Sequence, residues 1–304
     1  MGLKFFDLFA GIGGFRLGME RAGHVCVGSC EWDKNARETY KKNFGSYPEY
    51  DDAKDMHAQS LPSFDVLCAG FPCQAFSIAG KRLGFEDPRG NIFFEIARIA
   101  KAKKPSYLLL ENVKGLLSHE KGDTFRTIIS TLDEMGYDAE WQVLNSKYFV
   151  PQNRERVFIV GHLRGERTRQ VFPLGDFNEI SDKKKLREKE LSRTRSYSSA
   201  IDANYYKGPD GKRTLVQAVS IENTGANGRR IKDPGDPQFC LSQNCGVGIQ
   251  SNSRIRRLMP IECERLQGFP DNWTIGSDTQ RYRQCGNAVT VHVVEYIAQE
   301  LRLG

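Results

Sequence analysis

The stretch Lys4-Phe5-Phe6-Asp7-Leu8-Phe9-Ala10-Gly11-Ile12-Gly13-Gly14 decides the fold class of this chain. Its apolar first half predicts a buried strand, the glycines interrupt that strand, and a helical pattern follows from Phe15 to about Arg21. Glycines at such a turn let the backbone approach a ligand, and the free N–H groups of the next helix favour an anionic group. A tight turn without a ligand is the commoner origin of Gly-x-Gly-Gly. The motif therefore predicts an α/β fold and needs support elsewhere before it predicts a cofactor.

Two further strand ends give that support. The run from His24 to Cys30 ends at Glu31-Trp32, where doubly wound folds place the acidic residue that binds ribose hydroxyls. Trp32 could pack on an adenine, although a core aromatic would explain it equally well. Asp51-Asp52 follows as a third acidic end, suited to an adenine amino group. Together the three ends predict a nucleotide-like cofactor.

Composition limits the possible classes of protein. The chain has 304 residues, a net charge of +6 and 39% hydrophobic residues, which predicts a soluble globular protein of one large domain or, in preference, two unequal ones. No apolar run reaches the ~18–20 residues that cross a bilayer. The eight cysteines lack zinc-site spacing and stand in a large chain without an export signal, so we expect a cytoplasmic, reduced, metal-free protein. Basic residues concentrate between Lys183 and Arg257, where they could neutralise phosphates or simply keep a surface soluble.

Candidate catalytic residues follow other apolar runs. Cys73, in Phe71-Pro72-Cys73-Gln74, comes after the run from Asp65 to Gly70 and is expected at the carboxyl end of a strand, although most lone cysteines are structural. Glu111 ends the run from Tyr107 to Leu110 and is expected to be partly desolvated, which favours its protonated form and lets it donate a proton near neutral pH. A structural glutamate is the alternative. Ahead of the strand at 157–161, alternation predicts one shared face for Gln152, Arg154 and Arg156.

These motifs occur in the order found in one family. The segments 9–14, 71–74, 111–113 and 152–156, with Arg257 to Pro270 and Gln284 to Val289 near the carboxyl end, resemble the DNA cytosine-5 methyltransferases of bacterial restriction-modification systems. The resemblance covers nearly the whole chain except residues of about 174 to 250, which we call the variable region. Six motifs in the right order are far more specific than any one of them.

The resemblance implies a fold, an activity and partners. The fold would be an α/β, Rossmann-like S-adenosylmethionine-dependent methyltransferase domain, residues 1–173 plus 282–304, with a smaller, irregular target-recognition domain and hinge, residues 174–281. The activity would transfer a methyl group from S-adenosylmethionine to C5 of a flipped-out cytosine in a specific sequence of double-stranded DNA. We expect a monomer that modifies DNA alongside a possible cognate restriction endonuclease.

The resemblance also implies residue roles. In catalysis Cys73 would be the nucleophile, Glu111 the acid at N3, Arg156 a guanidinium beside the base, and Pro72 and Asn112 residues that shape the pocket. The residues implied to bind the cofactor are Phe9, Gly11, Gly13, Glu31, Trp32, Asp52 (chosen over Asp51), Pro72, Ile92, Asn287 and Val289. The residues implied to bind DNA are Ser77, Arg89, Arg154, Asn227, Arg229 and Arg257.

Parts of this assignment stay open. Asn227 would fill the gap left by the flipped base, but an ordinary glycine-rich surface loop also explains residues 224–230. Cys240-Leu241 stands where the family usually has Thr-Leu, which puts the threonine's phosphate contact in doubt. A tRNA cytosine-5 methyltransferase would share the cofactor turn and the nucleophile. The combination of Cys73, Glu111 and Arg156 argues against a silent DNA-binding module.

Overall fold

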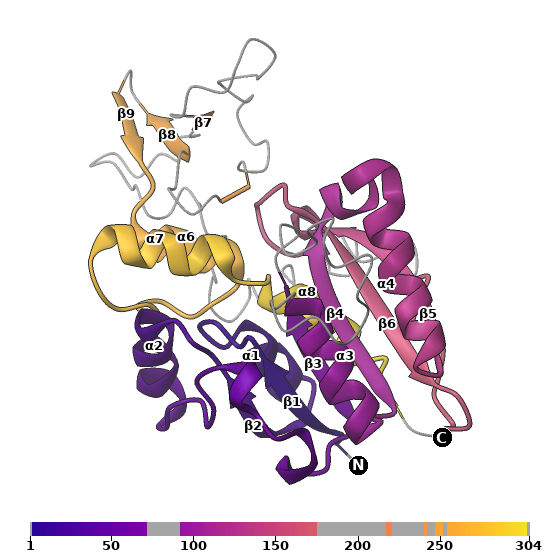
Figure 1. Cartoon of the computed structure of the whole chain (residues 1–304). Coiled ribbons are helices and arrows are strands. Elements are labelled where there is room, and N and C mark those ends of the chain that lie inside the picture. The colour runs from indigo at the N-terminus through magenta and orange to yellow at the C-terminus, as the bar shows by residue number, and fades with distance from the viewer. Residues whose placement is uncertain are drawn as a thin grey trace, which may run out of the picture. The chain divides into compact units, whose positions relative to one another are not determined.

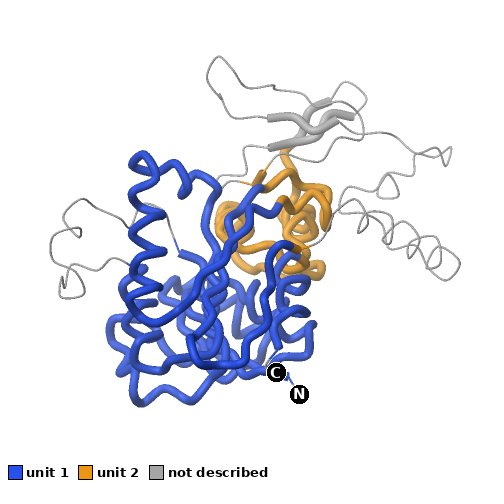
Figure 2. Tube along the Cα trace, turned by 90° about the vertical axis from the view of Figure 1, so that its right-hand side faces the viewer, with its two compact units in different colours: residues 1–144, 155–173, 293–304 blue, residues 145–154, 174–292 orange. Residues whose placement is uncertain are grey.

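The computed structural model describes residues 2–71, 92–174, 217–220, 240–241, 247–251 and 254–302. The chain divides into two compact units, shown in blue and orange in Figure 2. Unit 1 consists of Met1–Leu144, Glu155–Pro173 and Val293–Gly304, and unit 2 of Asn145–Arg154 and Leu174–His292. Residues 145–154 and 282–292 thus belong to unit 2, whereas the sequence-based boundaries place them in the catalytic domain.

Unit 1 is built on a six-stranded sheet in the order β2-β1-β3-β4-β6-β5 (Figure 1). Its strands are β1 (Lys4–Leu8), β2 (Val25–Cys30), β3 (Val66–Gly70), β4 (Tyr107–Val113), β5 (Tyr137–Asn145) and β6 (Glu155–Leu163). The first four strands named in the sheet order pair in parallel, and β6 is antiparallel to β4. The carboxyl ends of β1 to β4 and the amino end of β6 therefore meet at one edge. This confirms the predicted α/β class and brings the strand ends of unit 1 that carry Phe9, Glu31 and Glu111 to one edge.

Helices connect and cover these strands. They are α1 (Gly14–Arg21), α2 (Lys34–Phe44), α3 (Ile92–Lys103) and α4 (Asp123–Glu134), with short 3₁₀ turns η1 (Ala53–Asp55), η2 (Ala58–Ser60), η6 (Lys114–Leu117), η7 (His119–Gly122) and η8 (Ser146–Tyr148). Ile128 and Leu132 of α4 are buried in the core.

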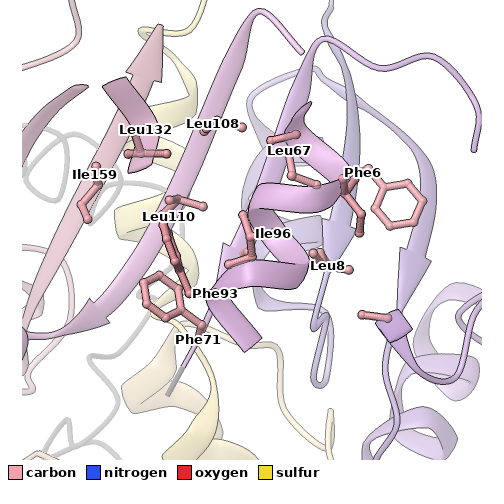
Figure 3. Packing of buried hydrophobic residues seen from close by; sticks show 14 of the residues in the cluster. Phe6, Leu8, Leu67, Phe71, Phe93, Ile96, Leu108, Leu110, Leu132 and Ile159 are labelled. Atoms are coloured by element: carbon pink, nitrogen blue, oxygen red, sulfur yellow. The ribbon is translucent and has the colours of Figure 1, made fainter. Parts of the chain in front are cut away.

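The main core lies between α3, α4 and the sheet. Figure 3 shows Phe93 and Ile96 of α3 directed at side chains from the central strands, including Leu110. The rings of Phe93 and Phe71 lie 5.6 Å apart, in a tilted pair of the kind that stabilises aromatic clusters. This packing fixes Phe71, which directly follows β3 and precedes Pro72 and Cys73 in the sequence.

The last helix, α8 (Val291–Ala298), belongs to unit 1 from Val293 onward. His24 links the end of α8 to the first strand: its Nδ1 accepts a hydrogen bond from Leu3 N at 3.0 Å, so its Nε2 donates to the carbonyl of Ala298 at 2.8 Å. Tyr107 donates its hydroxyl proton to the carbonyl of Arg302 at 2.6 Å. No helix in the described ranges is both long and apolar enough to cross a membrane.

The described residues of unit 2 include a small sheet and the helices α6 and α7. Its antiparallel strands lie in the order β7 (Gln217–Ser220), β8 (Val247–Ser251) and β9 (Arg254–Arg257). The helices are α6 (Pro260–Gln267) and α7 (Asp278–Asn287). Proline at the first position of α6 is compatible with a helix start, and Gly268 ends the helix in the left-handed conformation.

Asp7 is a charged residue type inside the sheet of unit 1. It is fully buried, its Oδ2 accepts a hydrogen bond from Arg16 N at 3.2 Å, and its Oδ1 accepts none within the described residues. Burial raises the pKa of Asp7 from its ordinary value of 3.8 to about 8, although the Arg16 N–H opposes the shift. Asp7 therefore binds the backbone of the first turn of α1, the helix that follows the glycine turn.

Asp7→Asn should remove one pH dependence of folding. Because the folded-state pKa is raised, the folded protein keeps this proton between about pH 4 and pH 8 while the unfolded chain loses it. The contribution of Asp7 to stability is thus present at low pH and lost as pH rises through that window, with a slope of at most about 1.4 kcal/mol per pH unit. Urea denaturation from pH 5 to 8 should show the variant gaining stability relative to the wild type as pH rises. Parallel curves would contradict the buried, protonated carboxyl.

Candidate active site

The turn after β1 is held in an unusual backbone conformation. Phe9 has φ 62°, a left-handed value that is uncommon outside glycine, and Gly11 and Gly13 have φ 56° and 86°. A Cβ on Gly13 would lie 2.2 Å from the ring of Phe44, so this glycine is needed for packing. A Cβ on Gly11 would meet nothing within 4 Å. The backbone at Gly11 therefore faces open space, as expected where a ligand approaches closely.

Glu31 joins this turn to the end of β2. Its Oε2 accepts a hydrogen bond from Gly11 N and its Oε1 from Asp33 N, each at 2.7 Å. Burial raises the pKa of Glu31, while the two backbone N–H groups oppose that shift. The carboxylate is thus fixed against the glycine turn, at the position predicted to bind ribose hydroxyls.

Trp32 is not a core residue, so that alternative is wrong. Its side chain is 69% exposed, whereas the neighbouring Glu31 is buried. A large aromatic face left in solvent beside a glycine turn suits stacking on a planar ring.

Asp51 and Asp52 are distinguished by their contacts. Asp51 pairs with Arg37, its Oδ1 lying 2.6 Å from Nη2. Asp52 is exposed and accepts a hydrogen bond from Lys54 N, which caps η1. This supports the choice of Asp52 for a ligand contact. Ile92, the first residue of α3, is partly buried and packs against the core.

Glu111 and Arg156 meet at the same edge of the sheet. The Nε of Arg156 lies 3.1 Å from Oε1 of Glu111, with side chains 16% and 12% exposed. The pairing of β4 with β6 sets Val113 opposite Arg156, which brings the two side chains together. Although this distance is that of an ion pair, Oε1 of Glu111 accepts no properly directed hydrogen bond from any described residue. The buried oxygen is therefore available to a donor on a ligand.

Asn112 holds the exit of β3. Its Nδ2 donates to the carbonyl of Phe71 at 2.7 Å, and its Oδ1 accepts from Val113 N at 2.8 Å. Phe71 N in turn donates to the carbonyl of Glu111 at 3.3 Å. The chain that continues to Pro72 and Cys73 therefore leaves the sheet beside Glu111. Six predicted site residues lie outside the described residues: Pro72, Cys73, Ser77, Arg89, Asn227 and Arg229.

The remaining predicted residues lie in unit 2. Asn287 is exposed at the end of α7, Val289 is buried, and the exposed Arg257 has its guanidinium carbon 6.0 Å from the ring centre of Tyr282. The shared face predicted for residues 152, 154 and 156 is wrong as a strand pattern, because β6 begins only at Glu155. Arg156 belongs to unit 1, whereas Gln152 and Arg154 belong to unit 2.

Arg154 does not have the geometry expected of a DNA contact. Its side chain is directed inward with 3% of the residue exposed, and it donates to the carbonyls of Leu241, Gly286 and Ala288. A buried guanidinium bound to main-chain carbonyls has few free N–H groups left to bind a phosphate.

The sequence analysis did not identify Asp7 and Gln267 as buried polar residues. For Asp7 the only signal was an acidic residue within an apolar strand. No group of three or more His, Cys, Asp or Glu side chains in the described ranges is placed to hold a metal ion.

The fold is α/β, with open space at the Gly11 backbone and a buried acidic side chain, Glu111, at the carboxyl edge of its sheet. A family model described as C-5 cytosine-specific DNA methylase matches residues 3–302. The chain is 39% identical over 312 residues to Type II methyltransferase M.HhaI of Haemophilus parahaemolyticus, covering 99% of this chain and 94% of that protein. It is 41% identical over 311 residues to Type II methyltransferase M.NgoBI of Neisseria gonorrhoeae, covering 96% and 90%.

Solved structures agree on the fold. The crystal structure of S. pombe Dnmt2 methyltransferase superimposes with a TM-score of 0.66 at 19% identity, covering 97% of this chain and 96% of that one. A putative DNA modification methyltransferase encoded within an E. coli prophage gives 0.63 at 20% identity, covering 98% of each chain. This chain belongs to the C-5 cytosine-specific DNA methylase family. The predicted family and the DNA cytosine-5 methyltransferase activity are thereby confirmed.

Trp32→Ala should weaken cofactor binding with little effect on stability. The exposed ring contributes little to the core, while stacking of a base on an aromatic ring is worth about 1–3 kcal/mol. Isothermal titration with S-adenosylmethionine should show an affinity loss of roughly fivefold to a hundredfold. Tyr47, also exposed on unit 1, offers a control as Tyr47→Ala, which should leave the affinity unchanged. Equal losses in both variants would remove the stacking role.

Proposed function

We propose that this enzyme transfers a methyl group from S-adenosylmethionine to C5 of a flipped-out cytosine within a specific sequence of double-stranded DNA. The observation that carries this proposal is the Glu111–Arg156 pair beside the exit of the Cys73 segment, with a buried Glu111 oxygen that accepts no hydrogen bond from the described residues. A protonated or N–H-bearing pyrimidine edge is the kind of group that this oxygen suits.

The residues present fit the methyl donor. The open face at Gly11, the fixed carboxylate of Glu31 and the exposed ring of Trp32 suit a backbone-contacted chain, a ribose and an adenine. Phe9, Gly13, Asp52 and Ile92 lie in the same unit, and Pro72, Asn287 and Val289 complete the proposed set. When bound, S-adenosylmethionine supplies an electrophilic methyl group. The protein's own contribution is to orient that group and to activate the base.

Activation of the base needs a nucleophile and an acid. C5 of cytosine becomes nucleophilic when the Cys73 thiolate adds at C6 and Glu111 places a proton at N3. Electron density then moves to C5, which accepts the methyl group. Loss of the C5 proton to solvent water expels the thiolate from C6, the N3 proton returns to Glu111, and 5-methylcytosine is left. Arg156 holds the Glu111 carboxylate in place throughout, and Asn112 fixes the backbone that leads to Pro72 and Cys73.

The base must leave the duplex before this chemistry can occur, because C6 is shielded within the stack. We assign the DNA contacts to Ser77, Arg89, Asn227, Arg229 and Arg257, and withdraw Arg154. The relatives are Type II methyltransferases, which supports a modification enzyme of a restriction-modification system. Such an enzyme would act as a cytoplasmic monomer on the same site as a cognate endonuclease.

Cys73→Ser should abolish methyl transfer while leaving DNA affinity within about threefold, because a hydroxyl is a far weaker nucleophile than a thiolate. A duplex with 5-fluorocytosine at the target, incubated with S-adenosylmethionine, should form a covalent complex with the wild type and none with the variant. Denaturing electrophoresis detects the covalent complex, or its absence, for each of the two proteins. Cys26→Ser is the matched control and should still form the complex. A wild type that forms no complex on DNA but methylates tRNA would replace the proposal with the RNA activity.

Glu111→Gln should lower kcat by about 10²–10⁴-fold, the usual contribution of a positioned acid. Titration should show an affinity for S-adenosylmethionine within about threefold of the wild type, since the described side-chain contact of Glu111 is with Arg156, which is not in the proposed cofactor set. Single-turnover kinetics separates the chemical step from binding. Equal loss of catalysis and cofactor affinity would identify a structural carboxylate instead.

A further inference from the structure

The carboxyl end of α7 has its carbonyl groups bound by side chains from elsewhere in unit 2. Arg154 Nη2 donates to the carbonyls of Gly286 and Ala288 at 3.1 and 2.9 Å. Gln267 Nε2 donates to the carbonyls of Cys285 and Ala288 at 2.7 and 3.2 Å. The last carbonyls of a helix lack partners within the helix, and a cation there is also favoured by the helix dipole. Arg154 therefore helps to determine where α7 ends.

Arg154 and Gln152 bind Leu241, a described residue of the variable region. Arg154 Nη1 donates to the carbonyl of Leu241 at 3.2 Å, and Leu241 N donates to Oε1 of Gln152 at 2.8 Å. Gln152 Nε2 reaches the carbonyl of Leu266 at 2.9 Å. Leu241 is 2% exposed. The guanidinium of Arg154 thus bonds to the end of α7 through Nη2 and to Leu241 through Nη1.

Asn287 lies between Gly286 and Ala288, whose carbonyls Arg154 binds. Asn287 is itself exposed, while the main chain on either side of it is held by these hydrogen bonds. The planar fork of a guanidinium can reach carbonyls on two segments at once, which the single ammonium of lysine cannot.

We propose that Arg154 is a positioning residue that presents Asn287 to the cofactor, and that it does so while bound to Leu241. The role of Asn287 rests on the proposed function. Removing Arg154 should free the end of α7 and weaken cofactor binding, without removing any group that touches the reacting atoms.

The test compares Arg154→Met and Arg154→Lys with Arg281→Met in the full-length enzyme. Arg281 is the matched control, because it also crosslinks unit 2, with Nη2 2.9 Å from Oε1 of Glu264 and Nε 2.9 Å from Oγ1 of Thr274, but bonds to neither Gly286 nor Ala288. Each variant is measured for thermal stability, for kcat and KM, for S-adenosylmethionine affinity by titration, and for amide hydrogen exchange at residues 240–241 and 285–290.

Arg154→Met should raise the KM and Kd for S-adenosylmethionine about tenfold or more, since it removes several charge-assisted hydrogen bonds, with kcat at saturating cofactor within about threefold. Hydrogen exchange at 241 and at 287–290 should accelerate together. Arg154→Lys should recover part of the affinity. Arg281→Met should lower thermal stability and leave the KM for the cofactor unchanged.

Three results would overturn the role of Arg154. They are an unchanged cofactor affinity in the Arg154 variants, an equal rise in KM in Arg281→Met, and exchange that accelerates across all of unit 2 alike. If Arg154→Met does not fold, Arg154→Lys is judged alone by the same criteria. A wild-type enzyme with no affinity for S-adenosylmethionine would contradict the proposed function itself, which the titration distinguishes from a failure confined to Arg154.

Discussion

The pairing register of β4 with its two neighbours is the constraint on which the site depends. Gly70 lies opposite Glu111 on one side, and Val113 lies opposite Arg156 on the other. Because side chains alternate along a strand, a slip of one residue would turn Glu111 to the other face of the sheet and away from its partner. The register is held by fully buried apolar residues of β4, Tyr107 to Leu110, so the core that stabilises the sheet also aims the proposed acid.

A second feature of the site is that strain and its compensation lie next to each other. Phe9 adopts a left-handed backbone that costs on the order of 1–3 kcal/mol in such residues. Around it, Glu31 accepts the Gly11 N–H and Asp7 accepts the Arg16 N–H, so the turn is bound at both ends by carboxyl groups. Burial raises the pKa of both groups, while these backbone N–H groups oppose the shift. Hydrogen bonds from two buried carboxyl groups thus anchor the glycine turn and the start of α1.

Much of this could be predicted from the sequence, for a physical reason. The strands at 4–8, 66–70 and 107–113 have strong apolar runs, and parallel strands must bring their carboxyl ends to one edge, so Glu31 and Glu111 could be placed without coordinates. Trp32 and Arg154 could not. Whether an aromatic at a strand end is buried depends on neighbours that the local pattern does not contain. Alternation predicted one face for residues 152–156, but the strand starts at Glu155, and the ends of helices in distant segments decide the partners of Arg154.

Leu241, a described residue of the variable region, is bound to the rest of unit 2 through its main-chain atoms. Arg154 and Gln152 recognise the carbonyl and the N–H of residue 241, which every amino acid except proline provides in the same form. Arg154 Nη1 also donates to the sulfur of Cys240 at 3.4 Å, so one side chain of this segment joins the main-chain contacts. Contacts to main-chain groups place few demands on the residue type, which allows one segment to be exchanged for another during evolution. New DNA sequence preferences could then arise by replacement of that segment while the proposed catalytic residues stay unchanged.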